Sequence, residues 1–173
     1  MKRIFQLFFS LFILIICVQQ SYAQTSIPQA QAIFTYNFTR LIEWPGDYKT
    51  GDFVIETYGN GEFYNEIKNY VKDKSVGSQK IVVKNVSNID EIGKCHILFV
   101  NFGKAKEIPS IISKIGSSKT LIISDKRGSL DDGAGIYFAI IEDKLKYEVK
   151  ASNITRMGLK YNSILENMAY AKH

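Results

Sequence analysis

Apolar residues recur at helical spacing in the segment that follows the first two dozen residues. Ile33, Leu41 and Trp44 fall on one face of a helix, because residues three, four and eight positions apart lie above one another. Pro28 stands where the first turn of a helix tolerates proline. Pro45 closes the pattern, since the residue before a proline avoids the helical region. The pattern therefore predicts a helix from Pro28 to Trp44.

Beyond this helix, short apolar runs alternate with helical patterns. The run over 95–101 is unbroken, which is typical of a central strand buried on both faces. Strands that alternate with helices indicate a mainly parallel sheet covered on both sides. The predicted strands are 53–58, 81–86, 95–101 and 120–124; the predicted helices are 62–71 and 106–115, with one helical turn after Asn88 and a glycine-rich loop over 125–135.

The C-terminal part of the chain carries a hairpin pattern followed by helical patterns. Strands over 136–141 and 145–149 flank a polar turn, which is typical of antiparallel pairing. Gly158 is favoured just past the end of a helix, and Ser163 to Glu166 form a capping box that starts another. We therefore expect a short helix ending at Met157, an extended piece over 159–161, and a last helix to about Ala171.

Together these elements predict the fold class. We expect an α/β domain with a three-layer, Rossmann-like sheet that is mostly parallel and gains an antiparallel C-terminal hairpin. The expected domain covers residues 24–173.

The first 23 residues have the pattern of a secretory signal peptide. Lys2 and Arg3 precede an apolar run over 4–18. Ser21 and Ala23 then place small residues at the two positions that a signal peptidase reads, so cleavage is expected between Ala23 and Gln24. The apolar run is shorter than the ~20 residues that a bilayer span needs. The sequence therefore predicts an exported, periplasmic protein.

Charge and cysteine content narrow the classes of function that the sequence allows. Without Lys2 and Arg3 of the predicted signal peptide, the formal net charge falls from +5 to +3, which is too mild for a nucleic-acid partner. Cys17 leaves with the predicted signal peptide, so Cys95 stands alone and no disulfide within the mature chain is expected. A chain of this size buries enough apolar surface without a metal or disulfide.

No residue pattern argues for catalysis. Cys95 and His96 are neighbours in a predicted strand, so their side chains point to opposite faces and do not form a dyad. Spacings typical of metal ligands are missing, and the acidic run Asp131-Asp132 is too short for a calcium loop. We therefore expect no enzymatic activity, no cofactor and no metal.

Two segments carry candidate binding residues. Ser124 and Asp125 follow the carboxyl end of a predicted strand, where open α/β sheets place their ligand crevice. Lys126 and Arg127 come next and suit an anion, although an ordinary connecting loop is the favoured interpretation of the segment. In the first predicted helix, Arg40 can pair with Glu43 three residues on, as part of a binding surface or of a packed amphipathic helix.

Four segments, in the same order along the chain, together resemble the YfiR family of periplasmic proteins. They are 32–45, with its aromatic-Asn-Phe and Glu-Trp-Pro pattern; the strand 95–100; Leu121 to Asp125 with Gly128; and 136–149 with Asn153, Arg156, Gly158 and Leu159.

The resemblance implies a periplasmic Rossmann-like domain that tends to dimerise. The best-known member type represses an inner-membrane diguanylate cyclase through its periplasmic sensor domain and is released by an outer-membrane lipoprotein. Related domains accompany membrane histidine kinases. In the type member the cysteine that matches Cys95 has a disulfide partner, whereas this chain offers none, so redox control through that disulfide is not expected here.

Two functional hypotheses follow. A regulator that docks on a membrane sensor should expose an apolar patch near the hairpin and Gly158. A periplasmic small-molecule binding module should instead hold a pocket with a few convergent polar groups. The residues expected to bind a partner or ligand are Tyr36, Arg40, Trp44, Ser124, Asp125, Ile136, Asn153 and Arg156.

Overall fold

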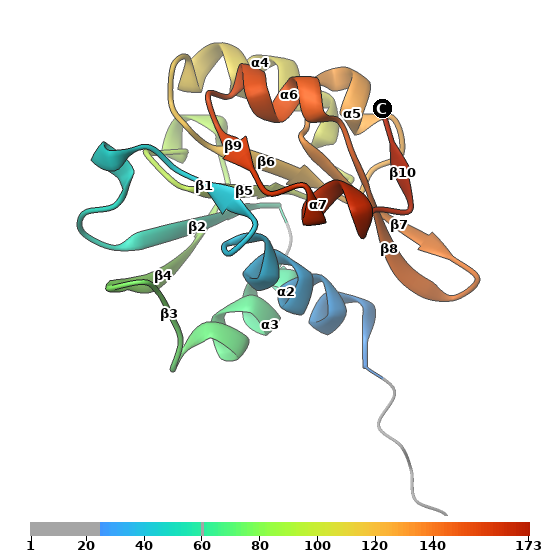
Figure 1. Ribbon diagram of the computed structural model, residues 1–173, viewed down its shortest axis with the longest axis horizontal. Coiled ribbons are helices and arrows are strands. Elements are labelled where there is room, and N and C mark those ends of the chain that lie inside the picture. The colour runs from blue at the N-terminus through green and yellow to red at the C-terminus, as the bar shows by residue number, and fades with distance from the viewer. Residues whose placement is uncertain (1–24, 60) are drawn as a thin grey trace, which may run out of the picture.

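The structure is a computed structural model, which describes residues 25–59 and 61–173 (Figure 1). The predicted signal peptide and its cleavage site lie outside the described residues. The strands are β1 (Ile42–Glu43), β2 (Phe53–Tyr58), β3 (Ser75–Val76), β4 (Gln79–Val86), β5 (Ile97–Val100), β6 (Leu121–Ser124), β7 (Ile136–Ile141), β8 (Lys144–Val149), β9 (Lys160–Tyr161) and β10 (Ala171–Lys172).

The helices lie between these strands along the chain. The α-helices are α2 (Ile27–Phe38), α3 (Gly61–Val71), α4 (Ile108–Ile115), α5 (Ser129–Asp132), α6 (Ala151–Arg156) and α7 (Ile164–Asn167). Three single 3₁₀ turns are η1 (Gly46–Tyr48), η2 (Ile89–Glu91) and η3 (Ala105–Glu107).

Eight strands form one sheet in the order β10-β8-β7-β6-β5-β2-β4-β3. The five strands from β4 to β7 are parallel, while β8 runs antiparallel to β7 and β3 antiparallel to β4. The parallel strands follow the doubly wound order 2-1-3-4-5. The predicted α/β class, with a mainly parallel sheet and an antiparallel hairpin, is confirmed.

The central strand β5 is buried on both faces, as its unbroken apolar run predicts. Ile97 and Phe99 pack with residues of α2 and α3, and Leu98 and Val100 pack with residues of α4. This division follows from the alternation of side chains along a strand. α2 and α3 therefore cover one face of the sheet, and α4 and α5 cover the other (Figure 1).

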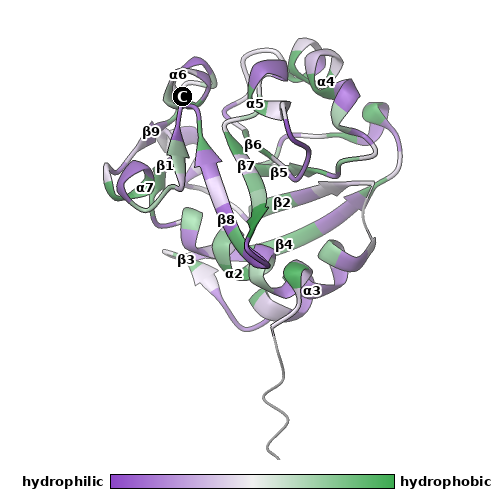
Figure 2. Cartoon of the chain, turned by 90° about the vertical axis from the view of Figure 1, so that its right-hand side faces the viewer, coloured by the Kyte–Doolittle hydropathy of each residue, from purple (hydrophilic) through white to green (hydrophobic). Residues whose placement is uncertain are grey.

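The hairpin differs from the central strands in its hydropathy. β7 is hydrophobic along much of its length, while β8 beside it is largely hydrophilic (Figure 2). The turn that joins them consists of Glu142 and Asp143, both with positive φ. This two-residue turn matches the right-handed twist of the two strands.

The first helix is shorter than its apolar pattern predicts. α2 ends at Phe38, and the backbone N–H groups of Thr39 to Leu41 donate to carbonyls three residues back, which tightens the last turn. Ile42 and Glu43 then pair with β9 as a two-stranded sheet. The predicted helix over 39–44 is wrong because a partner strand from the far end of the chain captures this backbone.

The last helix is also shorter than expected. α7 ends at Asn167, and the N–H of Tyr170 donates to the carbonyl of Tyr147 at 2.8 Å. β10 then pairs in parallel with β8. The last predicted turns of this helix therefore do not form, because the segment that follows α7 pairs with the free edge of the sheet at β8.

A further difference from the predicted elements is α5. This short helix forms inside the predicted loop, between two glycines of positive φ, Gly128 and Gly133.

Candidate functional site

The carboxyl ends of β5 and β6 bring two polar residues together. The Asn101 amide Nδ2 donates to the Asp125 carboxylate Oδ2 at 3.3 Å. The connection after β2 leads to α3 on one face of the sheet, and the connection after β5 leads to α4 on the other face (Figure 1). Because the connections after the neighbouring strands β2 and β5 leave to opposite faces of the sheet, a crevice opens between them at its carboxyl edge. Doubly wound sheets bind their ligands in such a crevice.

A cavity of about 520 Å³ lies at this edge, between the first turn of α2 and the hairpin. We call it the carboxyl-edge cavity. Polar and apolar groups line it in about equal measure, and the polar ones are Gln31, Glu62, Asn101, Asp125 and Tyr137. Sequence reasoning selected Asp125 but missed the other lining residues, because they come from elements far apart in the chain.

Asp125 is the electrostatically unusual group of this cavity. Burial raises the pKa of its carboxyl, while hydrogen bonds from backbone N–H groups and from the amides of Gln31 and Asn101 offset part of that effect. Its Oδ1 atom is buried and has no hydrogen-bond partner among the described residues. A carboxyl with a perturbed pKa at the ligand edge of a sheet is a functional-site candidate.

The neighbours of Asp125 do not form the anion site that the loop sequence suggests. The Lys126 ammonium lies 3.7 Å from the Asp132 carboxylate. Ser124 is fully buried, and its hydroxyl accepts a hydrogen bond from the Lys126 backbone N–H at 3.3 Å. Ser124 therefore shapes the turn after β6, and the charged groups that line the cavity are carboxylates.

A second cavity, of about 440 Å³, lies at the amino edge of the sheet and is lined by Arg40, Trp44 and His96, among others. We call it the amino-edge cavity. Trp44 is buried and packs edge-on against Phe53, with ring centroids 5.0 Å apart. Its indole N–H has no partner among the described residues.

His96 and Cys95 do not form a catalytic pair. His96 Nδ1 accepts from the Val54 N–H at 3.0 Å, and Nε2 lies 2.8 Å from the Tyr48 carbonyl. These contacts fix the neutral tautomer with the proton on Nε2, and burial lowers the pKa of His96. The Cys95 thiol lies on the other side of the chain beside Thr120, and burial raises its pKa. Both residues are structural.

Tyr36 and Arg40 contact each other beside α3. The Arg40 guanidinium lies 5.3 Å from the centre of the Tyr36 ring and donates to its hydroxyl at 3.4 Å. Tyr36 also packs edge-on against Tyr70 of α3. The expected pairing of Arg40 with Glu43 is replaced by an ion pair of 3.7 Å between Glu43 and Lys49.

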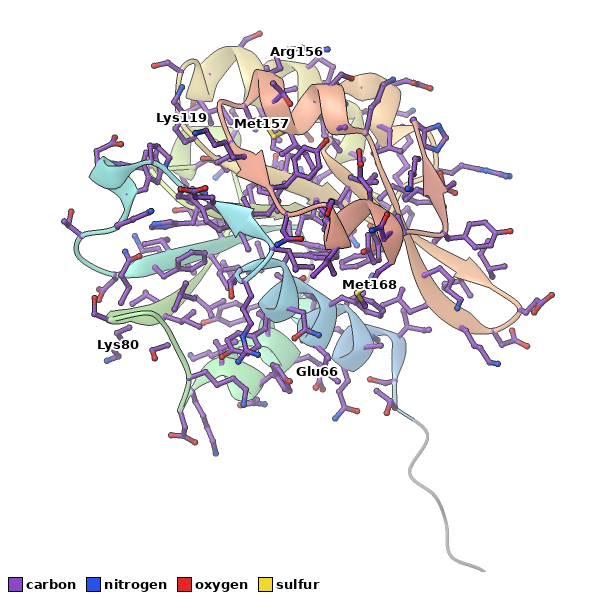
Figure 3. The ribbon with its side chains drawn as sticks, viewed as in Figure 1. Glu66, Lys80, Lys119, Arg156, Met157 and Met168 are labelled. Carbon is purple, nitrogen blue, oxygen red and sulfur yellow. The ribbon has the colours of Figure 1, made fainter. Side chains whose placement is uncertain are left out.

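The three C-terminal candidates do not share one surface, because Ile136 lies apart from Asn153 and Arg156. Ile136 is fully buried and Asn153 is nearly so, so both hold the core and a charge at Ile136 would disrupt it. Arg156 is exposed and points outward from the end of α6 (Figure 3). Arg156 and Asn153 both line a small hollow of about 50 Å³, together with Met157. The eight expected residues are thus divided among four places in the fold.

Sequence reasoning missed the large apolar side chains that the fold leaves in solvent. They are Phe102 (66% exposed), Ile140 (58%), Ile164 (47%), Met168 (63%) and Tyr170 (57%). Phe102 and Ile140 line the carboxyl-edge cavity. The other three belong to the segment from α7 to β10, which the sequence presents as an amphipathic helix with a buried apolar face.

Within the described ranges, no group of three or more His, Cys, Asp or Glu side chains is arranged to hold a metal ion. The helices of the same ranges are each too short or too polar to cross a membrane.

Comparison with protein families gives one match that covers most of the chain. The model of the family described as YfiR/HmsC-like matches residues 28–170. No curated protein matches the sequence.

Comparison with solved structures supports the fold. A conserved domain protein from Vibrio cholerae O1 biovar eltor is similar with a TM-score of 0.57 and 8% identity, over 86% of this chain and 60% of that one. The ABC domain in complex with L-Trp from Streptococcus pneumonia is similar with a TM-score of 0.53 and 12% identity, over 69% of this chain and 55% of that one. The chain thus spans little more than half of each neighbour, and the likeness concerns the fold.

Proposed function

Because the chain belongs to the YfiR/HmsC-like family, we propose that it is a non-enzymatic periplasmic regulator. It binds the sensor domain of an inner-membrane signalling protein, a diguanylate cyclase or a histidine kinase, and represses or modulates it. The predicted signal peptide delivers it to the periplasm. A homodimer is the expected form, and an outer-membrane lipoprotein is the expected releasing partner.

The observation that carries this proposal is a group of apolar side chains at the end of the chain. Ile164 and Met168 are four residues apart, so they lie on the same side of α7, and Tyr170 follows; all three are about half exposed or more. We call these three residues the C-terminal apolar surface. Exposed apolar groups of this kind mark protein interaction sites.

The C-terminal apolar surface is also held firmly in place. Leu165, between its first two residues, is fully buried. The Tyr147 hydroxyl donates to the Leu165 carbonyl at 2.6 Å. A segment that is anchored to the core while its apolar side chains face solvent is ready to dock without first being ordered.

Site-specific photo-crosslinking in the native envelope tests the proposal. A benzophenone side chain at position 168 should cross-link to a membrane protein that carries a cyclase or kinase output domain. Position 80 is the matched control, because Lys80 is exposed on β4, toward the opposite end of the sheet (Figure 3). Cross-links to the same protein from both positions, or to the chain itself only, would contradict the docking surface.

A charge variant gives the matching functional readout. Met168→Glu should fold normally and yet release the membrane partner, which changes the level of cyclic diguanylate or kinase phosphorylation. Lys80→Glu should leave the output unchanged. If Met168→Glu also leaves it unchanged, the partner binds elsewhere.

A periplasmic small-molecule binding module is the second candidate function. The carboxyl-edge cavity favours it, because its volume falls in the range of ligand pockets, roughly 300–1,000 Å³, and polar groups from several elements converge in it. The two functions are compatible, since a ligand can shift the balance between docked and free forms.

A further inference from the structure

The described residues contain two methionines, and the fold treats them differently. Met168 is 63% exposed at the end of α7. Met157 is half-buried and packs against core residues on both faces of the sheet. The two side chains lie in separate parts of the fold (Figure 3). The Met168 side chain is therefore open to small reagents in solution, whereas the core shields that of Met157.

The single cysteine of the described residues is closed to oxidants. Cys95 is fully buried, its thiol lies 3.9 Å from the Thr120 hydroxyl, and burial raises its pKa. Oxidants attack the thiolate form of an accessible cysteine, and Cys95 offers neither the thiolate nor the access. Within the described ranges, the sulfur atom that an oxidant in solution reaches most readily is thus that of Met168.

Met168 also belongs to the C-terminal apolar surface. It stands one helical turn after Ile164, whose carbonyl accepts a hydrogen bond from the Met168 N–H at 3.0 Å, and Tyr170 follows two residues later. Oxidation of a thioether turns an apolar group into a polar sulfoxide. A sulfoxide that is buried against an apolar partner without a donor is costly, so one oxygen atom at this position opposes docking.

The fold can accept this change without unfolding, because other groups hold the backbone around Met168. Leu165 is fully buried, and its carbonyl accepts a hydrogen bond from the Tyr147 hydroxyl at 2.6 Å. The Tyr170 N–H donates to the Tyr147 carbonyl at 2.8 Å. Neither contact uses the Met168 side chain, so oxidation alters the surface and leaves its scaffold in place.

We propose that Met168 is a reversible oxidation site that controls docking on the membrane partner. A peroxide transfers one oxygen atom to the thioether sulfur: the O–O bond breaks, an S–O bond forms, the sulfur gives up two electrons, and water leaves. The undocked protein, in which Met168 is exposed, is the form that is oxidised. A methionine sulfoxide reductase restores the thioether, as a dithiol becomes a disulfide and the oxygen leaves as water. The control of docking rests on the proposed function.

Peptide mass spectrometry of the purified mature protein tests the oxidation site. In millimolar hydrogen peroxide, Met168 should gain one oxygen atom about tenfold faster than Met157, because its side chain is exposed. The protein unfolded in guanidinium chloride is the matched control, since both thioethers are then accessible and the two rates should converge. Equal rates in the folded protein, or faster oxidation of Met157, would overturn the proposal.

Cross-linking tests the control of docking. Protein with a benzophenone at position 164 is treated with peroxide, freed of it, and added to spheroplasts of the host. Treatment should lower the cross-link to the membrane partner about tenfold, because a polar group now has to be desolvated, and methionine sulfoxide reductase with dithiothreitol should restore it. In Met168→Leu, which lacks the thioether, treated and untreated yields should be equal. A peroxide effect that persists in Met168→Leu, or none in the parent protein, would overturn the proposal.

Thermal denaturation separates lost docking from lost structure. The oxidised protein should melt at the temperature of the untreated protein, because the anchoring contacts of α7 remain. A marked fall in the melting temperature would assign the lost cross-link to unfolding and overturn the proposal.

These measurements distinguish this inference from the docking proposal. If the untreated protein gives no cross-link to a membrane partner, the docking proposal fails and the control of docking fails with it. The ratio of the two oxidation rates needs no partner and decides the oxidation site alone. If that ratio is close to one while cross-linking succeeds, the docking surface stands and the oxidation site is wrong.

Discussion

Asn153 shows how one buried side chain holds two segments in register. It is 3% exposed, and its amide Nδ2 donates at 2.7 Å to the carbonyls of both Leu130 and Ala134. These carbonyls flank the turn after α5, in which the Ala134 N–H also donates to the Ser129 carbonyl at 2.9 Å. The asparagine selected as a binding residue is thus a structural clamp.

Asn153→Ala should lower the free energy of unfolding by about 1–3 kcal/mol, because the Ala134 carbonyl loses its amide donor while the Leu130 carbonyl keeps the Gly133 N–H. Urea denaturation followed by fluorescence measures the change. Asn167→Ala, at an exposed position, is the control and should change stability little. A loss no larger than that of the control would show that water replaces the amide.

Asp125→Asn should make the protein more stable at neutral pH. Burial raises the pKa of the folded carboxyl, so ionisation costs more in the folded state than in the unfolded state. That cost is fully present above the folded pKa and vanishes below the unfolded value of about 3.9. The variant should therefore melt higher at pH 8, by ~2–4 °C for each 1 kcal/mol removed.

Melting curves recorded between pH 8 and pH 4 test the direction of this change in stability. The gain of Asp125→Asn should shrink as the pH falls through the folded pKa. The control Asp52→Asn should follow the parent protein. A gain that stays constant with pH would mean that the raised pKa is not its cause.

At the scale of elements, local patterns predicted what forms, and long-range pairing decided where it stops. β2, α3, β5, β6 and both strands of the hairpin form where period and turn residues indicate. The ends of α2 and α7 could not be predicted, because β9 and β8 capture the next residues. The sequence contains no local signal for a partner strand that lies far along the chain.

The residues in the turn of the hairpin are not the most stable ones for its backbone conformation. Glu142 and Asp143 have φ values of 50° and 59°, which cost energy for residues with a Cβ. Replacing the pair by Asn-Gly should raise the free energy of unfolding by about 1 kcal/mol. Thermal denaturation measures it; Asp143→Ala is the opposite control and should lower stability.

At the scale of the whole molecule, the sheet and its central strand could be predicted, but the surfaces could not. Asp125 was found because a polar residue directly follows a buried strand. Phe102, Ile140 and Met168 were missed because exposure depends on which elements happen to cover a residue, and apolar residues in a sequence suggest burial. Both cavities are assembled from segments that only the folded chain brings together.

Removal of residues 163–173 tests how far the end of the chain supports the whole. Leu165 is fully buried, Tyr147 donates to its carbonyl, and the His173 N–H donates to Val149. The truncated chain should lose more stability than Leu165→Ala, which itself should cost about 2–5 kcal/mol. Deletion of His173 alone should cost far less. Equal stability of the truncated and full chains would show that α7 and β10 are accessory.

The pairing of β1 with β9 has a consequence for how the protein is made. Ile42 lies opposite Tyr161, so the strand that follows the first helix stays without its partner until synthesis has passed Tyr161. Contacts between such distant residues form slowly, because the loop between them must close first. The nascent chain thus cannot complete its fold early. During this delay it stays accessible to proteins that bind unfolded polypeptides.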